Sequence, residues 1–470
     1  MNEIINKHLI QLSLSFSYNG ERLFDMISDG RVGVQCEYMV EGWRVVLTHG
    51  TKSYINYQPL FIDRILPAEK RDVICATRAF YSAAAQMCGF YPEWGIIDGV
   101  KPVRLYLNLL ERGVNASQII RDNYLLTTEK ASLVSDIGSF QYETAKKLPP
   151  NSYNLYISIP FCPTRCKYCS FISADAGMAK LIPDYLDALC EEIKATAEIM
   201  KDIALNTVYI GGGTPTVLDE KQLEKLLSTI KSSFDIGNIE YTLEAGRPDT
   251  VTREKMALAL AYGVNRVSIN TQTTNNDVLK AVGRRHTAED YFAAFEIARN
   301  AGIPAINTDL IAGFENDTFE KSLSDVISLA PENLTIHTLC VKNSAALREE
   351  GFVRTADGLS SLVGESIKKC HTNGYFPYYL YKQKNAMAGL ENIGYTKQGF
   401  ECVYNICMMS EFNSTVALGA GGATKMVYPD RVSDRTEGFF DCKYPKQYIE
   451  DKEKTQRKQE FLRSFLGNIK

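Results

Sequence analysis

Hydrophobic residues recur at two different spacings in the first part of the chain, and each spacing predicts a different element. In residues 1–62 they alternate with polar residues, first over residues 12–18 and again over residues 32–40. Alternation with a period of two is typical of strands that bury one face, so the sequence predicts antiparallel strands there. Residues 68–88 instead place apolar side chains three or four positions apart, which predicts a helix.

Proline and glycine residues mark the ends of further elements before residue 150. Pro102 lies near the start of one expected short helix, and Gly113 lies just past its end. Proline is favoured in the first helical turn and glycine just after the last, so this placement supports the helix. Another helix is expected after Thr127, and residues 138–151, which contain two adjacent prolines, are typical of a linker.

From residue 153 onward, short apolar runs alternate with amphipathic stretches such as residues 182–200. The apolar runs are Leu155–Ile159, Thr207–Ile210, Ile239–Leu243, Arg266–Asn270, Ala305–Ile311 and Leu334–Val341. Strands that are apolar on both faces, each followed by a helix, indicate a parallel sheet covered by helices. The sequence therefore predicts an α/β fold with a partial (β/α)6 barrel, in which each repeat has about 35 residues.

These changes of pattern predict three domains, and a length of 470 residues is in keeping with two or three. Residues 1–150 form an N-terminal α+β domain, and residues 151–385 form the barrel. Residues 386–470 are rich in glycine near position 420 and end in a charged tail that is expected to be helical. We expect this last segment to be a small C-terminal domain that covers the substrate.

Composition and charge exclude several classes of protein. Hydrophobic residues make up 45% of the chain and charged residues 23%, and the formal net charge is −4. This is the composition of a globular protein, and its mildly acidic balance argues against a nucleic-acid partner. No apolar run approaches the ~20 residues of a membrane span, and the N-terminus lacks the apolar core of a signal peptide. We therefore expect a cytoplasmic protein.

The twelve cysteines fall into two groups. Disulfides are not expected in the cytoplasm, and most of these cysteines occupy apolar, periodic contexts that are typical of core positions. The cysteines assigned to the core in this way are Cys75, Cys88, Cys190, Cys340 and Cys370. Only one group of cysteines has the spacing of metal ligands.

That group is Cys162, Cys166 and Cys169, which follow the first barrel strand with C-x3-C-x2-C spacing. Three thiolates suit a 4Fe-4S cluster and leave one iron open to a small molecule. A zinc site is the alternative, but zinc normally takes a fourth Cys or His nearby. Position 171 is Phe, and the nearest histidine is His286. Three unrelated core cysteines are the remaining interpretation.

Polar residues stand where the expected barrel strands end. Residues 211–215, GGGTP, follow the second strand, Glu244 ends the third, Gln272 ends the fourth, and Asp309 lies in the fifth. Chemistry in β/α barrels takes place at this end of the strands, and a buried carboxylate is costly unless it is paired or binds a ligand. Taken singly, each residue could belong to a turn or be a satisfied core group; together they predict one active rim.

The cysteine spacing, with an aromatic residue before the third cysteine, resembles the signature of the radical SAM superfamily. The resemblance implies that S-adenosylmethionine (SAM) binds the open iron of a 4Fe-4S cluster through its amino and carboxylate groups. One electron from the reduced cluster then cleaves SAM and yields a 5′-deoxyadenosyl radical. This chemistry needs a low-potential electron donor such as flavodoxin or ferredoxin, and anaerobic conditions.

Within that superfamily, several stretches resemble the oxygen-independent coproporphyrinogen III dehydrogenase branch: LYISIPFCPTRCKYCSF, YIGGGTPT, LEAGRPDT, RVSINTQTTNNDVLKAVGRRHT and NTDLIAGF. The added N-terminal segment of about 150 residues is similar to that of the HemZ-type members. The resemblance assigns the cluster-bound SAM to Tyr156, Gly212 and Glu244. It assigns a second SAM-binding region to Tyr168, Gly213, Thr214, Gln272, Arg284 and Asp309.

The resemblance implies a tetrapyrrole substrate and oxidative decarboxylation of coproporphyrinogen III to protoporphyrinogen IX. The cations expected near the propionates are Arg165, Lys167, Arg247 and Arg285. Two features depart from the family patterns. Phe171 stands where the classical dehydrogenase has a fourth cysteine, as in the haem-chaperone branch. The haem-binding HNxxYW stretch of those chaperones is replaced by ECVYNICMM, which has neither His nor Trp.

Three other functions stay open on the sequence. The first is a haem carrier that does not consume SAM, and the second is a radical SAM enzyme that opens or methylates haem anaerobically. The third is that residues 1–150 form a separate partner-binding module. The missing HNxxYW stretch counts against the carrier.

Overall fold

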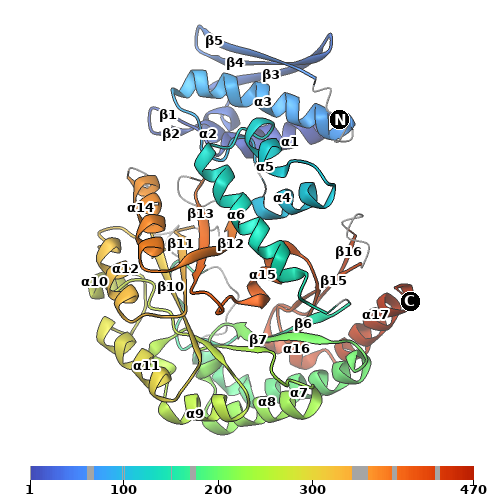
Figure 1. The fold of residues 1–470 in the computed structure, drawn as a ribbon, viewed down its shortest axis with the longest axis vertical. Coiled ribbons are helices and arrows are strands. Elements are labelled where there is room, and N and C mark those ends of the chain that lie inside the picture. Colours follow the sequence, from blue (N-terminus) through green and yellow to red (C-terminus); the bar gives the residue numbers. More distant parts are fainter. Residues whose placement is uncertain are drawn as a thin grey trace. The chain divides into compact units, whose positions relative to one another are not determined.

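A computed structural model of the chain describes residues 2–60, 68–97, 99, 101–149, 151–169, 176–340, 358–383, 389–428 and 435–469. The chain divides into two compact units, one of residues 1–139 and 381–384 and one of residues 140–380 and 385–470. Figure 1 shows the ribbon and the element labels used below. Within the described residues, no helix combines the length and the apolar character needed to cross a bilayer.

The first unit is built on a three-stranded antiparallel sheet and a long helix. Its elements are α1 (Asn2–Ser13), β1 (Ser17–Tyr18), β2 (Glu21–Arg22), α2 (Leu23–Ser28), β3 (Val32–Met39), β4 (Gly42–His49), β5 (Lys52–Pro59), α3 (Ala68–Cys88), α4 (Pro102–Glu111), α5 (Ala116–Asp122) and most of α6 (Thr128–Ala145). The sheet order is β3-β4-β5, and helix α3 packs on β4 and β5. Val45 and Leu47 of the central strand are fully buried.

Two predictions for this part of the chain are wrong. The expected strand over residues 12–18 is helical as far as Ser13, and only Ser17–Tyr18 is extended. Ile5, Leu9 and Leu12 are buried at helical spacing, and this face packs against α3, so its burial outweighs the short serine alternation.

The expected linker over residues 138–151 is also helical at its start, because α6 continues to Ala145. Gly138 lies inside this helix rather than at a break. A Cβ atom at this position would come within 2.3 Å of the Tyr106 ring, so the glycine allows a close helix contact. The other helices predicted in this region, α3, α4 and α6, are confirmed.

The second unit contains the predicted barrel strands with their helices. Its strands are β6 (Tyr153–Ile159), β7 (Leu205–Gly212), β8 (Glu240–Glu244), β9 (Arg266–Ser268), β10 (Ala305–Ala312), β11 (Asn333–Thr338), most of β12 (Phe376–Lys382), β13 (Glu391–Thr396), β14 (Ser414–Leu418), β15 (Ala423–Val427) and β16 (Thr436–Phe440). Its α-helices are α7 (Ile182–Met200), α8 (Glu220–Ser233), α9 (Arg253–Ala261), α10 (Asn276–Ala281), α11 (Ala288–Asn300), α12 (Phe319–Ser328), α14 (Leu359–Thr372), α15 (Val403–Ser410), α16 (Pro445–Glu450) and α17 (Lys454–Asn468).

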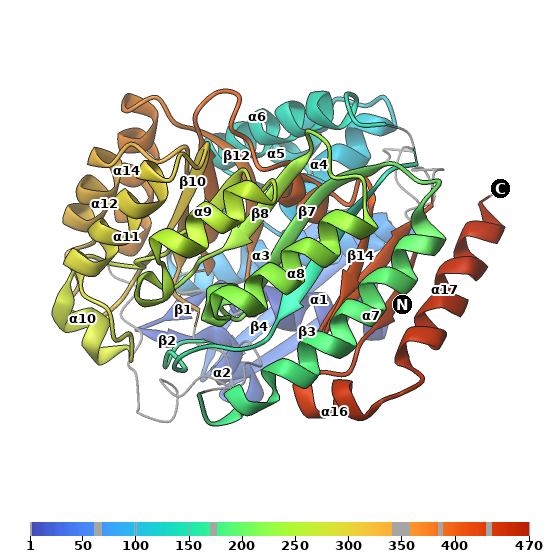
Figure 2. The same ribbon diagram turned by 90° about the horizontal axis from the view of Figure 1, so that it is seen from below.

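The strands form one sheet in the order β12-β13-β11-β10-β9-β8-β7-β6-β14-β15-β16. Strands β6 to β11 are parallel and follow one another in chain order, which confirms the predicted α/β fold with six parallel strands. Figure 2 shows helices α7, α8, α9 and α11 side by side along the outer face of these strands. Strand β14 pairs in parallel with β6, so the segment after residue 389 extends the same sheet.

A fully buried ion cluster fastens the C-terminal helix α17 to the second unit. The Lys458 side chain is 1% exposed, and its ammonium nitrogen lies 2.6 Å from one carboxylate oxygen each of Glu192 and Asp441. The Tyr448 hydroxyl donates to Glu192 over 2.5 Å, and the Gly419 amide donates to the same carboxylate over 2.9 Å. Paired charges of this kind are stable only while all members are present.

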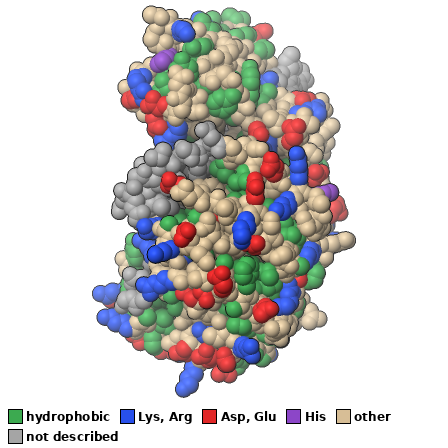
Figure 3. Space-filling view, turned by 90° about the vertical axis from the view of Figure 1, so that its left-hand side faces the viewer, with side chains coloured by type: hydrophobic (Ala, Val, Ile, Leu, Met, Phe, Trp, Pro, Cys, Tyr) green, Lys and Arg blue, Asp and Glu red, His purple; other side chains and the backbone are tan. Residues whose placement is uncertain are grey.

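The surface is of mixed charge. Figure 3 shows acidic and basic side chains interspersed over the lower part of the face that it presents. This mixture agrees with the net charge of −4.

Candidate functional site

The cysteine loop leaves the end of strand β6 directly. Cys166 is 9% exposed, and Cys162 and Cys169 are half-buried. A turn joins the last two cysteines, because the Cys169 amide donates to the Cys166 carbonyl oxygen over 3.0 Å. The Thr214 hydroxyl, from the loop after β7, lies 3.5 Å from the Cys162 sulfur and donates to it.

The three cysteines therefore share one loop, and this donor set suits the cluster that the sequence predicts, because soft thiolates favour iron–sulfur binding. Among the described residues, no three His, Cys, Asp or Glu side chains converge as a finished metal site. Phe171, the position of the classical fourth cysteine, lies outside the described residues.

The glycine run after β7 lies against the cysteine loop. The Gly213 amide donates to the Ile159 carbonyl over 2.9 Å, and the Thr214 amide donates to that of Phe161 over 2.7 Å. A Cβ atom at Gly213 would lie 2.5 Å from the Phe161 carbonyl oxygen, and Gly212 has a φ of 107°. These glycines are therefore required by the close approach of two backbone segments.

Glu244 ends strand β8, as predicted, and its carboxylate lies among tyrosine residues. The Tyr209 hydroxyl donates to Glu244 Oε1 over 2.6 Å. Burial raises the pKa of Glu244 to about 7, although the Tyr209 hydrogen bond opposes the shift. The Tyr209 ring stacks on that of Tyr404, with centroids 4.3 Å apart, and on that of Tyr156, 6.2 Å away. Tyr404 comes from helix α15, so the C-terminal segment contributes directly to the site.

Asp309 lies in strand β10 and is paired with a histidine that the sequence left unassigned. His337, from the neighbouring strand β11, places Nε2 3.5 Å from Asp309 Oδ2. The Asn307 amide donates to Asp309 Oδ1 over 2.9 Å. Burial alone would raise the pKa of Asp309, but the contacts with His337 and Asn307 hold it below its ordinary value. Asp309 is therefore an anion at neutral pH.

Gln272 follows strand β9 in a strained conformation. Its φ is 73°, in the left-handed region that residues other than glycine rarely adopt. Its Oε1 is buried, with no hydrogen-bond partner among the described residues. A buried, unsatisfied amide oxygen is costly, and its presence is typical of a group that meets a ligand.

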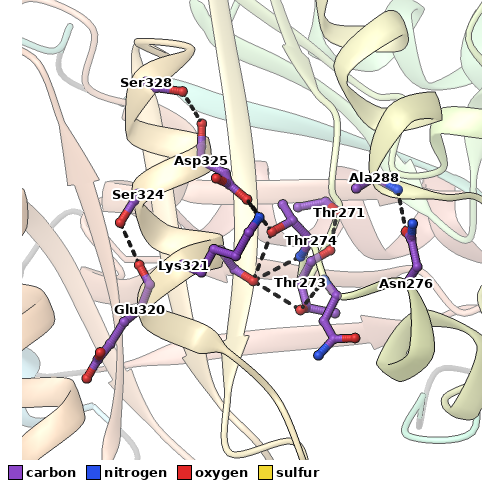
Figure 4. Close-up of polar contacts among 12 residues, drawn as sticks. Thr271, Thr273, Thr274, Asn276, Ala288, Glu320, Lys321, Ser324, Asp325 and Ser328 are labelled. Atoms are coloured by element: carbon purple, nitrogen blue, oxygen red, sulfur yellow. Dashed lines mark hydrogen bonds and ion pairs between the residues drawn. The ribbon is translucent and has the colours of Figure 1, made fainter.

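A network of threonines holds this turn in place (Figure 4). The Thr273 hydroxyl donates to Asp317 over 2.7 Å, and the Thr274 hydroxyl donates to Asp325 over 2.6 Å. The Thr274 amide donates to the Ser322 hydroxyl over 3.0 Å. Helix α12 thereby fixes the backbone on the C-terminal side of Gln272.

Arg284 and Tyr168 lie together, as the prediction of a shared region requires. Arg284 Nη1 donates to the Tyr168 hydroxyl over 3.0 Å, and Nη2 donates to the Gly246 carbonyl over 2.9 Å. His286 is buried nearby. Burial and the guanidinium groups of Arg284 and Arg247 lower its pKa to about 3, so this imidazole is neutral at physiological pH.

The structure changes the expected role of Arg247. Its side chain is 3% exposed and is held by Thr164 and Asp249. The contact with a propionate that the sequence suggested for this residue is therefore not supported by its position. Arg165 and Arg285 are exposed and Lys167 is half-buried, so these three stay candidates.

Sequence reasoning missed three residues of the site: Tyr209, Tyr404 and His337. Each stands in an apolar stretch and has the pattern of a core residue. The sequence held no usable signal for any of the three, because even His337 falls in the middle of the predicted strand Leu334–Val341 and not at its end.

Comparisons with known proteins agree with this geometry. The model of the radical SAM superfamily matches residues 156–326. An oxygen-independent coproporphyrinogen-III oxidase-like protein, HemZ, from Bacillus subtilis is 36% identical over 378 residues, which cover 77% of this chain and 75% of the relative. The haem chaperone HemW from Haemophilus influenzae is 31% identical over 312 residues, which cover 64% of this chain and 76% of the relative.

A solved structure has a similar fold. It is that of the coproporphyrinogen III oxidase HemN from Escherichia coli, described as a radical SAM enzyme, and it covers 67% of this chain and 71% of its own. The TM-score is 0.51 and the sequence identity is 21%, so this likeness concerns the fold.

Proposed function

The chain belongs to the radical SAM superfamily, in the group of HemZ-like proteins, and we propose that it catalyses the oxidative decarboxylation of coproporphyrinogen III. In this reaction two propionate side chains become vinyl groups and the product is protoporphyrinogen IX. Each propionate loses CO2, one proton and two electrons. The enzyme therefore works under anaerobic conditions with a low-potential electron donor such as flavodoxin or ferredoxin, and an electron acceptor.

The residues of the chain supply the binding framework. Cys162, Cys166 and Cys169 would hold a 4Fe-4S cluster with one open iron. When a reduced cluster and SAM are bound, they supply the strong hydrogen-abstracting radical that an unactivated propionate C–H bond demands. We expect Glu244 to accept hydrogen bonds from SAM and Asp309 to supply a fixed anion on the neighbouring part of the rim.

One observation carries the choice of an enzyme over a haem carrier. The carrier branch has its haem-binding stretch where this chain has ECVYNICMM. Here that stretch forms α15, and its Tyr404 packs on Tyr209, which holds Glu244. This segment therefore supports the carboxylate expected to bind SAM, and it has no histidine or tryptophan of its own.

The haem carrier is the second candidate, because HemW proteins are among the relatives and Phe171 replaces the classical fourth cysteine. An anaerobic haem-modifying radical SAM enzyme is the third. The enzyme proposal predicts that SAM cleavage depends on coproporphyrinogen III, whereas a carrier has no such requirement.

The test uses anaerobically reconstituted protein reduced with dithionite. We expect 5′-deoxyadenosine to form faster when coproporphyrinogen III is added, and haem to bind only weakly and without fixed stoichiometry. Stoichiometric binding of haem, without stimulation of SAM cleavage by coproporphyrinogen III, would contradict the enzyme proposal and favour the haem carrier. SAM cleavage that haem stimulates, with a modified haem as product, would favour the third candidate.

A further inference from the structure

A buried arginine lies against the sulfur of the middle cysteine. Arg247 follows strand β8 three residues beyond Glu244, and its Nη1 is 3.8 Å from the Cys166 sulfur, to which it donates. The same nitrogen donates to the Thr164 hydroxyl over 2.9 Å and to the Thr164 carbonyl over 3.3 Å. One guanidinium group therefore binds both the backbone and a sulfur of the cysteine loop.

The other end of the guanidinium group is anchored, so its orientation is fixed. Nε lies 3.2 Å from Asp249 Oδ1, and Nη2 donates to Asp249 Oδ2 over 3.4 Å. The Arg247 carbonyl oxygen accepts from the Thr250 amide over 2.9 Å and from the Thr250 hydroxyl over 2.8 Å. A planar donor held on both sides loses little further freedom when it binds sulfur, so its contact is well defined.

The environment strengthens this contact. Arg247 and Cys166 are both buried, at 3% and 9% exposure, so solvent screens their interaction poorly. Hydrogen bonds and positive charge at the sulfurs of an iron–sulfur site stabilise the more negative, reduced state of the cluster and so raise its reduction potential.

We infer that Arg247 is a positioning residue of the cluster site, which fixes the loop around Cys166 and raises the potential of the bound cluster by donating to its sulfur. The inference rests on cluster binding by the three cysteines and is independent of the tetrapyrrole substrate. It gives the RPDT segment of the LEAGRPDT stretch a function other than contact with propionates.

The test compares Arg247→Gln with wild type after anaerobic reconstitution, by iron and sulfide content, by the rate of iron loss to a chelator, and by redox titration of the cluster. We expect a midpoint potential shifted to a more negative value and iron loss that is several-fold faster. Arg247→Lys keeps the positive charge but not the planar arrangement of donors in the guanidinium group. Its midpoint potential and its rate of iron loss should therefore lie between those of the wild type and Arg247→Gln.

The matched control is Lys280→Gln, which removes an exposed cation from helix α10. The backbone just beyond this helix meets the cysteine loop, where the Lys167 amide donates to the Val282 carbonyl. This variant should keep the wild-type potential and iron retention. An equal shift in both variants would assign the effect to net charge and overturn the role of the sulfur contact.

A wild-type potential and wild-type iron retention in Arg247→Gln would overturn the inference. If that variant folds without any cluster, or does not fold, Thr164→Val decides, because it removes one anchor of the guanidinium group without changing charge. A smaller shift of the same sign in Thr164→Val supports the inference, and unchanged values overturn it. A wild-type protein that binds no cluster would instead contradict the family-level assignment, which keeps the two failures distinct.

Discussion

The Tyr209 hydroxyl donates a 2.6 Å hydrogen bond to the Glu244 carboxylate, and this contact joins strand β7 to the end of the neighbouring strand β8. Because the Tyr209 ring also stacks on Tyr404, the orientation of the carboxylate depends on a helix 160 residues further along the chain. The proposed SAM site is thus built from the barrel and from the segment that follows it.

Tyr209→Phe is expected to weaken SAM binding and to shift its pH dependence. The variant loses the hydrogen bond that holds the Glu244 pKa down, so this pKa should rise above its present value of about 7. A hydrogen bond to a charged group contributes ~1.5–3 kcal/mol, and a loss at the lower end of this range corresponds to about a tenfold fall in the affinity for SAM. Calorimetric titration of the cluster-loaded protein with SAM at several pH values measures both effects.

Tyr241→Phe is the matched control, because the Tyr241 hydroxyl is buried without a partner among the described residues. It lies on β8, the strand that ends at Glu244. This variant should bind SAM as the wild type does. Equal SAM affinities of Tyr209→Phe and wild type across the pH range would contradict the positioning role of Tyr209.

The stability of the apoprotein should depend on pH through Glu244. Its pKa is raised from 4.5 to about 7, so between these values the folded protein holds a proton that the unfolded chain has released. The free energy of unfolding therefore falls as the pH rises through this window. The side chain of Glu244→Gln cannot titrate, so the free energy of unfolding of this variant, measured in urea, should depend less on pH. Between pH 4 and pH 8 its change should be smaller than that of the wild type by at most about 3 kcal/mol.

Glu191→Gln serves as the control for this titration, since Glu191 is an exposed residue of helix α7. It should keep the wild-type pH profile. Parallel profiles for Glu244→Gln and wild type would mean that Glu244 is not buried as the structure shows.

Lys458→Met should destabilise the second unit strongly. The substitution leaves Glu192 and Asp441 buried beside each other without their cation, and breaking a buried pair in this way costs about 3–5 kcal/mol. Burial raises the pKa of Asp441 to about 7, so protonation of this carboxyl should relieve part of the loss at lower pH.

Arg457→Met, on the same helix, is the comparison for Lys458→Met. Arg457 pairs with Asp451 and Glu453 near the surface, where an ion pair contributes about 0–1 kcal/mol. The thermal unfolding midpoint of Lys458→Met should be clearly lower than that of Arg457→Met. Similar unfolding midpoints would show that the buried cluster does not anchor helix α17.

Cys166→Ala should abolish cluster binding, whereas Cys190→Ala and Cys370→Ala should not. Wild-type protein is expected to hold about four irons per chain after reconstitution, since the three thiolates suit one 4Fe-4S cluster. Cys190 and Cys370 are buried in the core of the second unit, so their variants test for indirect effects of folding. Unchanged iron and sulfide in Cys166→Ala would contradict the ligand assignment.

The sequence predicted those parts of the fold whose signal is local. The six predicted apolar runs correspond to β6 to β11, and the predicted amphipathic stretch 182–200 corresponds to helix α7. The cysteine loop and Glu244 were placed correctly at strand ends, because a parallel sheet brings all these ends to one edge. The strand expected over residues 12–18 was wrong, since tertiary burial of the upstream helical face decided the structure.

The remaining residues of the site depend on contacts between distant segments. In the sequence, Tyr209 stands in an apolar run and has the pattern of a core residue. Only the folded structure shows that it contacts both Glu244 and Tyr404. Arg247 and Cys166 are 81 residues apart, and no spacing rule predicts that a guanidinium group meets a particular sulfur. Such pairings follow from the three-dimensional arrangement of the loops.

The most direct test of the proposed function is product analysis. Reconstituted protein is incubated anaerobically with SAM, dithionite, an electron acceptor and coproporphyrinogen III, and the porphyrins are then separated and identified by mass spectrometry. The account predicts products in which propionate groups have become vinyl groups, formed together with 5′-deoxyadenosine, and none of these products with Cys166→Ala. Unchanged coproporphyrin from a protein that holds its full cluster and binds SAM would contradict it.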